Sequence, residues 1–306
     1  LACIEGGGQP VGARATAVSD RATRRGRDPL GALGGGNHFL EIQLVQAIYD
    51  REAARALGLE LDQITVLVHT GSRGLGHQVC TDHVRAMDAS LARYGITLPD
   101  RQLACVPFAS PEGGAYFAAM CAAANFAFAN REVLTHRVRE AFREANPNAV
   151  VRVVYDVAHN IAKIEQHGGK RVCVHRKGAT RAFGPDDDDV PAPYRAIGQP
   201  VLIPGSMGTA SFVLVGSGAS TLSFASACHG AGRAMSRTAA RGQVKGGELR
   251  RELASQGIAV RCPSNAELAE EAPIAYKDVE RVVDVVHRAG IARKVARLVP
   301  VGVLKG

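Results

Sequence analysis

Residues 224–237 (FASACHGAGRAMSR) bring together groups that can handle a phosphate. His229 precedes a Gly-Ala-Gly turn, and Arg233 and Arg237 follow four residues apart. If Gly230 opens a helix, its free N–H groups would face an anion and the two arginines would share one face. Imidazole can be a nucleophile, a general base or a metal ligand near neutral pH. The segment therefore predicts a histidine beside a held phosphate; the alternative is a glycine-rich turn around a packed histidine.

Three further histidines stand in similar surroundings. His38 lies in GGGNHFLE (34–41), His69 ends the predicted strand 62–69, and His159 follows the predicted strand 150–157. Imidazoles suit Zn, Mn, Fe or Ni, so three histidines could bind metal while the fourth does chemistry. A metal beside a nucleophilic histidine indicates phosphoryl or nucleotidyl transfer.

Other charged stretches indicate function less specifically than the histidine segments do. HRKGATR (175–181) is typical of a phosphate-binding turn, and the basic residues 19–28 predict a surface loop that either touches RNA or is merely solvated. Four aspartates at 186–189 could bind a hard cation, but a solvated loop is favoured. The GxGxxG-like strings are incomplete and no P-loop is present.

Composition narrows the class of protein. The 306 residues carry a formal net charge of +8, which suits RNA, DNA or a nucleotide as partner. Tryptophan is absent, which argues against base binding on an aromatic platform. Seven cysteines without a CxxC pair predict reduced thiols in a cytoplasmic protein. No transmembrane-length apolar run or signal peptide is visible, and the start at Leu1 predicts an N-terminally truncated chain.

The predicted helices and strands that must position the four histidines alternate irregularly along the chain, which predicts a single α+β domain. The apolar run 298–304 should carry Lys305 into the protein as an ordered end. Helices are expected at 43–57, 75–94, 111–145, 160–165 and 277–289, and strands at 62–69, 150–157, 171–175, 200–203, 211–215 and 298–304.

The chain resembles the RtcB family of GTP-dependent RNA ligases. The resemblance implies one α+β, RtcB-like domain over residues 1–306, the C-terminal part of the family's chain, with mixed β-sheets flanked by helices. The matching stretches, in family order, are GGGNHFLE (34–41), HTGSRGLG (69–76), DVAHNIAKIE (156–165), VHRKGATRAFGP (174–185), QPVLIPGSMGTASFVLVG (199–216), CHGAGRAMSR (228–237) and the final Lys305-Gly306.

The resemblance also implies an activity. The family joins an RNA 3′-phosphate or 2′,3′-cyclic phosphate end to a 5′-hydroxyl end, in tRNA splicing or RNA repair, through a GMP-histidine intermediate. GTP is the co-substrate, two Mn²⁺ ions serve each site, and the partners are tRNA halves or broken RNA and, in some cases, an archease-type activator; no membrane is involved.

The family's functional residues carry over to matching positions. His229 would receive GMP, and His38, His69 and His159 would bind manganese. Glu41 would recognise the guanine edge. Arg73, Arg176, Lys177 and Arg233 are the candidates for RNA phosphates. The residues expected around the nucleotide are Asn37, His38, Phe39, Leu40, Glu41, His159, Asn160, Pro204, Gly205, Ser206, Met207, Ser211, His229, Gly230, Ala231, Gly232, Tyr276 and Lys305.

One departure from the family concerns the metal. The family's Asp-Gly-Cys-Gly-like motif, upstream of the GNHF segment, has no counterpart in these residues. We therefore expect the 306 residues alone to hold at most one ion per site, and weakly. The absence of a KxDG motif favours histidine over lysine as nucleophile. The alternatives are a metal-dependent phosphohydrolase and a non-catalytic RNA- or GMP-binding fragment.

Overall fold

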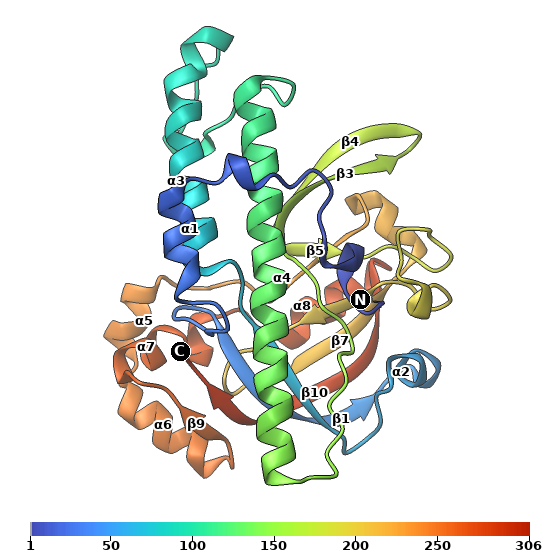
Figure 1. Ribbon diagram of the computed structural model, residues 1–306. Coiled ribbons are helices and arrows are strands. Elements are labelled where there is room, and N and C mark those ends of the chain that lie inside the picture. Colours follow the sequence, from blue (N-terminus) through green and yellow to red (C-terminus); the bar gives the residue numbers. More distant parts are fainter. Residues whose placement is uncertain (1) are drawn as a thin grey trace. The chain divides into compact units, whose positions relative to one another are not determined.

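The chain folds into two compact units. The computed structural model describes residues 2–306, and Leu1 lies outside them (Figure 1). The first unit comprises the segment that ends at Gly7, Leu33–His69 and Val151–Gly306, and the second comprises Gly8–Ala32 and Thr70–Val150. Helices and mostly antiparallel sheets together confirm the α+β class. Among residues 2–306, no helix combines the length and apolar character needed to cross a membrane.

A mixed sheet forms the centre of the first unit. Its strand order is β2-β1-β10-β7-β6, and the short β9 pairs with β10 in the sheet's one parallel ladder among the described residues. β3 pairs with β4, and β5 with β8, as separate two-stranded sheets. The strands are β1 Phe39–Ile48, β2 Ile64–His69, β3 Asn160–His167, β4 Lys170–Lys177, β5 Ala179–Arg181, β6 Pro200–Ile203, β7 Ser211–Gly216, β8 Ser226–Cys228, β9 Ala259–Arg261 and β10 Ala292–Leu304.

Helices of the first unit pack around this sheet. Val279, Val283 and Val286 of α8 are buried in one core with Phe212 and Leu214 of β7. Burying such aliphatic side chains is the main force that holds helix and sheet together. The helices are α2 Arg51–Leu57, α5 Arg237–Gln243, α6 Gly246–Ser255, α7 Asn265–Glu270 and α8 Val279–Arg288, with 3₁₀ turns η1 Glu5–Gly8, η5 Ala192–Tyr194, η6 Gly218–Ser223 and η7 Pro273–Ala275.

The second unit is helical. The Ser110 hydroxyl accepts a hydrogen bond from the Gly113 N–H and so caps the long helix α4. A side chain at Gly26 of α1 would lie 2.8 Å from Leu75 of α3, so glycine permits these two helices to approach closely. Its helices are α1 Asp20–Arg27, α3 Arg73–Ser90 and α4 Pro111–Ala145, with 3₁₀ turns η2 Ala15–Ala17, η3 Leu91–Tyr94 and η4 Arg101–Leu103.

Two predictions for the first 60 residues are wrong. Residues 43–57 are the second half of β1 followed by α2, because β1 pairs with β2 on one side and β10 on the other. The Asp50 carboxylate accepts the Ala53 N–H and starts the helix only there. Residues 19–28 are helical as α1 rather than a loop, since the Ser19 hydroxyl accepts the Ala22 N–H and caps the helix.

Three predictions around the histidine segments are also wrong. Residues 150–157 form no regular strand, and Asp156 forms an isolated β-bridge with Ile4. Residues 160–165 belong to β3 rather than a helix, because β4 supplies backbone partners along their whole length. Gly230 opens no helix: α5 begins at Arg237, after the Ser236 cap, so Arg233 and Arg237 do not share a helix. The strands and helices predicted elsewhere are present, with ends shifted by a few residues.

Candidate active site

Four histidines from separate segments meet in the first unit. The rings of His159 and His229 are stacked with centroids 4.1 Å apart. The His69 ring lies 5.0 Å from that of His159, 6.3 Å from that of His229 and 6.0 Å from that of His38. His38 precedes β1, His69 ends β2, His159 precedes β3 and His229 follows β8. The structure thus places these four histidines close together, although two of the elements that carry them differ from prediction.

We call His38, His69, His159 and His229 the histidine cluster; burial favours the uncharged imidazole for two of them, His69 and His229. Burial, and then the nearby rings, lowers the pKa of His69 well below its usual value. Burial also lowers the pKa of His229. A neutral ring keeps a lone pair, which is what a nucleophile or a metal ligand requires.

The imidazole nitrogens of the histidine cluster are possible metal ligands. The Nε2 atoms of His69 and His159 face each other at 3.0 Å, and the buried Nδ1 of His69 has no hydrogen-bond partner within the described chain. Nowhere in residues 2–306 are three His, Cys, Asp or Glu side chains grouped closely enough to hold a metal ion as they stand. His69 and His159 therefore fit a metal as a pair of imidazole donors, with His38 nearby.

Gly178 holds the position of His229. The backbone N–H of His229 donates to the Gly178 carbonyl at 3.3 Å, and the Gly178 N–H donates to the His159 carbonyl at 2.9 Å and to the Asn160 side-chain oxygen at 3.1 Å. Gly178 has φ +68°, and a Cβ there would lie 3.3 Å from the His229 ring. Only glycine satisfies both the backbone conformation and the available space.

We expect Gly178→Ala to displace the His229 ring. Gly168→Ala is the matched control, because Gly168 also has positive φ (+56°) and a Cβ there meets no described atom within 4 Å. Both substitutions should cost roughly 1–2 kcal/mol of stability for the left-handed backbone. Imidazole NMR signals should shift for His229 only in Gly178→Ala, and equal shifts in both variants would contradict this account.

A second polar group surrounds Glu41 on β1. The Gln43 amide nitrogen donates to the Glu41 carboxylate at 2.5 Å and to the Ser211 hydroxyl oxygen at 2.9 Å. The Gly205 N–H donates to the same hydroxyl at 3.0 Å, which ties the turn after β6 to this group. Burial raises the pKa of Glu41 to about 8, against the opposing effects of Gln43, Ser211 and Lys305. Sequence reasoning missed Gln43, whose alternation with Glu41 has meaning only on a strand.

Lys305 is an ordered part of the protein, as predicted. It is 7% exposed, and its backbone N–H donates to the Arg261 carbonyl at 2.8 Å. Its ammonium donates to the Gly36 carbonyl and lies 5.9 Å from the centre of the Phe39 ring. Burial lowers the pKa of Lys305, partly offset by Glu271. The end of the chain therefore brings a cation to the glycine-rich segment that leads into His38.

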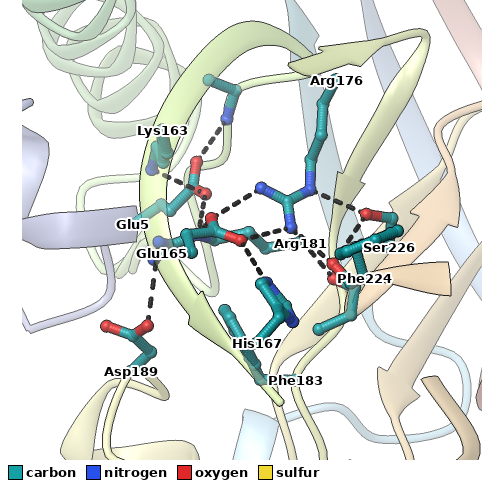
Figure 2. Close-up of polar contacts among 12 residues, drawn as sticks. Glu5, Lys163, Glu165, His167, Arg176, Arg181, Phe183, Asp189, Phe224 and Ser226 are labelled. Carbon is teal, nitrogen blue, oxygen red and sulfur yellow. Dashed lines mark hydrogen bonds and ion pairs between the residues drawn. The ribbon is translucent and has the colours of Figure 1, made fainter. Parts of the chain in front are cut away.

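The arginines predicted for RNA differ in their surroundings. Arg176 is corrected: it is buried, and both terminal nitrogens donate to the Glu165 carboxylate at 2.7 and 2.9 Å, which leaves it unsuited to RNA (Figure 2). Arg233 donates to the Glu270 carbonyl at 2.7 Å and stacks on Tyr276, 5.0 Å from the ring centre. Lys177 is exposed. Arg73 begins α3 in the second unit, with φ 51°.

Sequence reasoning also missed a buried ionic cluster (Figure 2). Glu165 accepts hydrogen bonds from Arg176 and, at 2.6 Å, from Arg181, and pairs with His167 at 2.9 Å. Glu5 pairs with Lys163 at 2.8 Å. We call Glu5, Lys163, Glu165, His167, Arg176 and Arg181 the Glu165 cluster.

The Glu165 cluster links the strands next to the histidines. Arg176 lies on β4 just before Gly178, and its side chain also donates to Ser226 on β8, at 2.9 Å, two residues before Cys228. Glu5 accepts the Ala158 N–H at 2.9 Å, directly before His159. Buried hydrogen bonds and ion pairs of the Glu165 cluster therefore connect β3, β4 and β8, the strands next to His159, Gly178 and His229.

The acidity of Glu165 predicts how stability depends on pH. Burial acts to raise its pKa, but the Arg176 hydrogen bonds and the Arg181 charge outweigh it and lower the pKa to about 2, from an ordinary value of 4.5. A lowered folded-state pKa stabilises the protein above pH 4.5, and this contribution disappears as pH falls toward 2, by about 3 kcal/mol in all. Urea unfolding measured from pH 6 to pH 2.5 should show that the free energy of unfolding falls less steeply with decreasing pH in Glu165→Gln than in the unsubstituted protein. An equal pH dependence in both proteins would contradict the lowered pKa of Glu165.

Comparison with known proteins places the chain in a family. A family model described as tRNA-splicing ligase RtcB matches residues 1–306. The tRNA-splicing ligase RtcB of Pyrococcus furiosus is 56% identical over 99% of this chain and 32% of its own length, and that of Thermococcus kodakarensis is 56% identical over 99% of this chain and 65% of its own. The RNA-splicing ligase RtcB of Mycobacterium bovis is 54% identical over 99% of this chain and 70% of its own. The chain thus spans about a third to about two thirds of these relatives, and over that span it belongs to the RtcB family.

Proposed function

We propose that the chain carries the guanylyl-transfer site of an RNA ligase that joins 3′-phosphate or 2′,3′-cyclic phosphate ends to 5′-hydroxyl ends. The main support for this proposal is the placement of His229. Burial lowers its pKa, its ring is stacked on that of His159, and its backbone N–H donates to the Gly178 carbonyl. A neutral, oriented imidazole is what nucleophilic attack on phosphorus requires. The names of the relatives support RNA as the substrate.

In the proposed reaction, a ring nitrogen of His229 attacks the α-phosphorus of GTP. A P–N bond forms, the bond from that phosphorus to the β-phosphate oxygen breaks, and pyrophosphate leaves. An oxygen of the RNA 3′-phosphate then takes GMP from the histidine as the P–N bond breaks. The RNA 5′-hydroxyl loses its proton and attacks the activated 3′-phosphate, and GMP leaves as the phosphodiester bond forms.

The other side chains would bind and orient the nucleotide. Glu41 would accept the guanine N–H groups, and Lys305 would offset part of the phosphate charge. His69 and His159, with His38, would hold Mn²⁺, which when bound neutralises phosphate charge. The remaining residues that we propose around the nucleotide are Asn37, Phe39, Leu40, Asn160, Pro204, Gly205, Ser206, Met207, Ser211, Gly230, Ala231, Gly232 and Tyr276.

RNA would be held mainly by charge. The net charge of +8 supports a polyanionic partner, and exposed Lys177 lies next to Gly178. Arg73 remains a candidate, whereas the internal contacts of Arg233 favour a structural contribution. tRNA halves or broken RNA as substrates, an archease-type activator and a cytoplasmic location are part of the same proposal.

GTP labelled at the α-phosphate tests the proposal directly. Incubation with Mn²⁺ and separation under denaturing conditions should show label that is attached to protein, acid-labile and stable to alkali, as expected for a phosphoramidate. Label released as GMP or GDP without a protein adduct would instead support a phosphohydrolase. Retention of intact GTP, with no chemistry, would leave only a nucleotide-binding function.

A further inference from the structure

We propose that Gln43 determines purine specificity by holding the Glu41 carboxylate in the orientation that pairs with guanine. This inference rests on the proposed function and adds to it a positioning residue that would not itself touch the nucleotide. It predicts that the preference for GTP over inosine triphosphate depends on one buried amide.

The backbone places the Gln43 side chain beside that of Glu41. The two side chains lie two residues apart on β1 and point to the same buried face. Gln43 lies opposite Pro300 on β10, where the register shifts, and Ser211 of β7 lies opposite Leu298 on the other side of β10. The Gln43 amide therefore reaches across β10 and joins the two flanking strands.

The neighbouring atoms determine which end of the amide faces Glu41. The Ser211 hydroxyl oxygen accepts both the Gln43 amide N–H and the Gly205 N–H, so its own proton can be donated to Glu41. Gln43 likewise donates to Glu41 Oε2 at 2.5 Å. Two donors thus converge on one carboxylate and restrict its rotation.

The other carboxylate oxygen of Glu41, Oε1, differs from Oε2 in its hydrogen bonding. Glu41 is 1% exposed, and Oε1 has no hydrogen-bond partner within residues 2–306. A buried acceptor without a donor is costly unless a ligand supplies one. Guanine offers two adjacent donors, N1–H and the 2-amino group, that match a carboxylate held in the plane of the base. Hypoxanthine lacks the 2-amino group, and adenine presents an N1 lone pair instead of an N–H.

The test compares nucleotide binding by Gln43→Met and by Gln46→Met. Methionine keeps the length of the side chain but has no amide donor. Gln46 is the matched control, because it lies on the same strand and is exposed. Titration calorimetry with GTP, inosine triphosphate and ATP gives the ratio of affinities for each protein. Loss of one buried hydrogen bond should reduce the preference for GTP over inosine triphosphate about tenfold in Gln43→Met, and Gln46→Met should keep the original ratio.

The outcomes separate this inference from the proposed function. An unchanged ratio in a folded Gln43→Met protein would overturn the inference while leaving the ligase proposal intact. If the unsubstituted chain binds GTP selectively but forms no GMP adduct, the catalytic proposal fails and the specificity test still stands. If Gln43→Met does not fold, Gln43→Glu keeps the volume and places a second carboxylate beside Glu41, which should lower the same ratio; a preserved ratio there would also overturn the inference.

Discussion

Replacing His229 with glutamine is expected to abolish the covalent GMP adduct. Glutamine fills much of the volume of the ring, but an amide nitrogen is not nucleophilic, so no P–N bond can form. Loss of a nucleophile typically lowers the rate by roughly 10³-fold or more. The measurement is the amount of protein-bound label after incubation with α-labelled GTP and Mn²⁺. Because His229 lies in a loop after β8, thermal unfolding should change little.

His287→Gln is the control for this experiment. His287 lies on α8 and is exposed, so the same substitution there should leave adduct formation unchanged. An adduct of normal yield in His229→Gln would show that another residue carries GMP. The stacked ring of His159 would then be the next side chain to test.

Replacing Glu165 with leucine is expected to lower the free energy of unfolding by about 3–5 kcal/mol, because it leaves buried guanidinium groups without their counter-charge. Arg176 and Arg181 both donate to this carboxylate, and the Arg176 side chain is 1% exposed. Urea unfolding followed by circular dichroism gives the magnitude.

Glu248→Leu provides the comparison for a surface ion pair. Glu248 pairs with Lys245 at 3.3 Å, with 60% of its side chain exposed, and such pairs contribute about 0–1 kcal/mol. If Glu165→Leu costs no more than Glu248→Leu, the Glu165 cluster is not a stabilising element.

The sequence by itself determined which side chains are candidates for the chemistry of the site. His69 at the end of an alternating apolar run and His229 before a glycine-rich turn could be singled out as candidate reactive groups, because side-chain types and short spacings do not depend on the fold. Local rules were equally reliable for helix ends: Ser110 caps α4, and Gly58 and Gly290, both with positive φ, follow α2 and α8.

Tertiary structure decided which segments became strands. β1 pairs with β10 from the far end of the chain, and β3 is a strand because β4 supplies its partners. Such pairings depend on distant residues, so short-range periodicity predicted helices at both places. Tertiary structure also decided which polar groups are buried together: Gln43 meets Ser211 only across β10, and Glu165 on β3 meets Arg181 on β5 only in the folded chain. Burial lowers the local dielectric and strengthens these contacts, and no spacing in the sequence encodes burial directly.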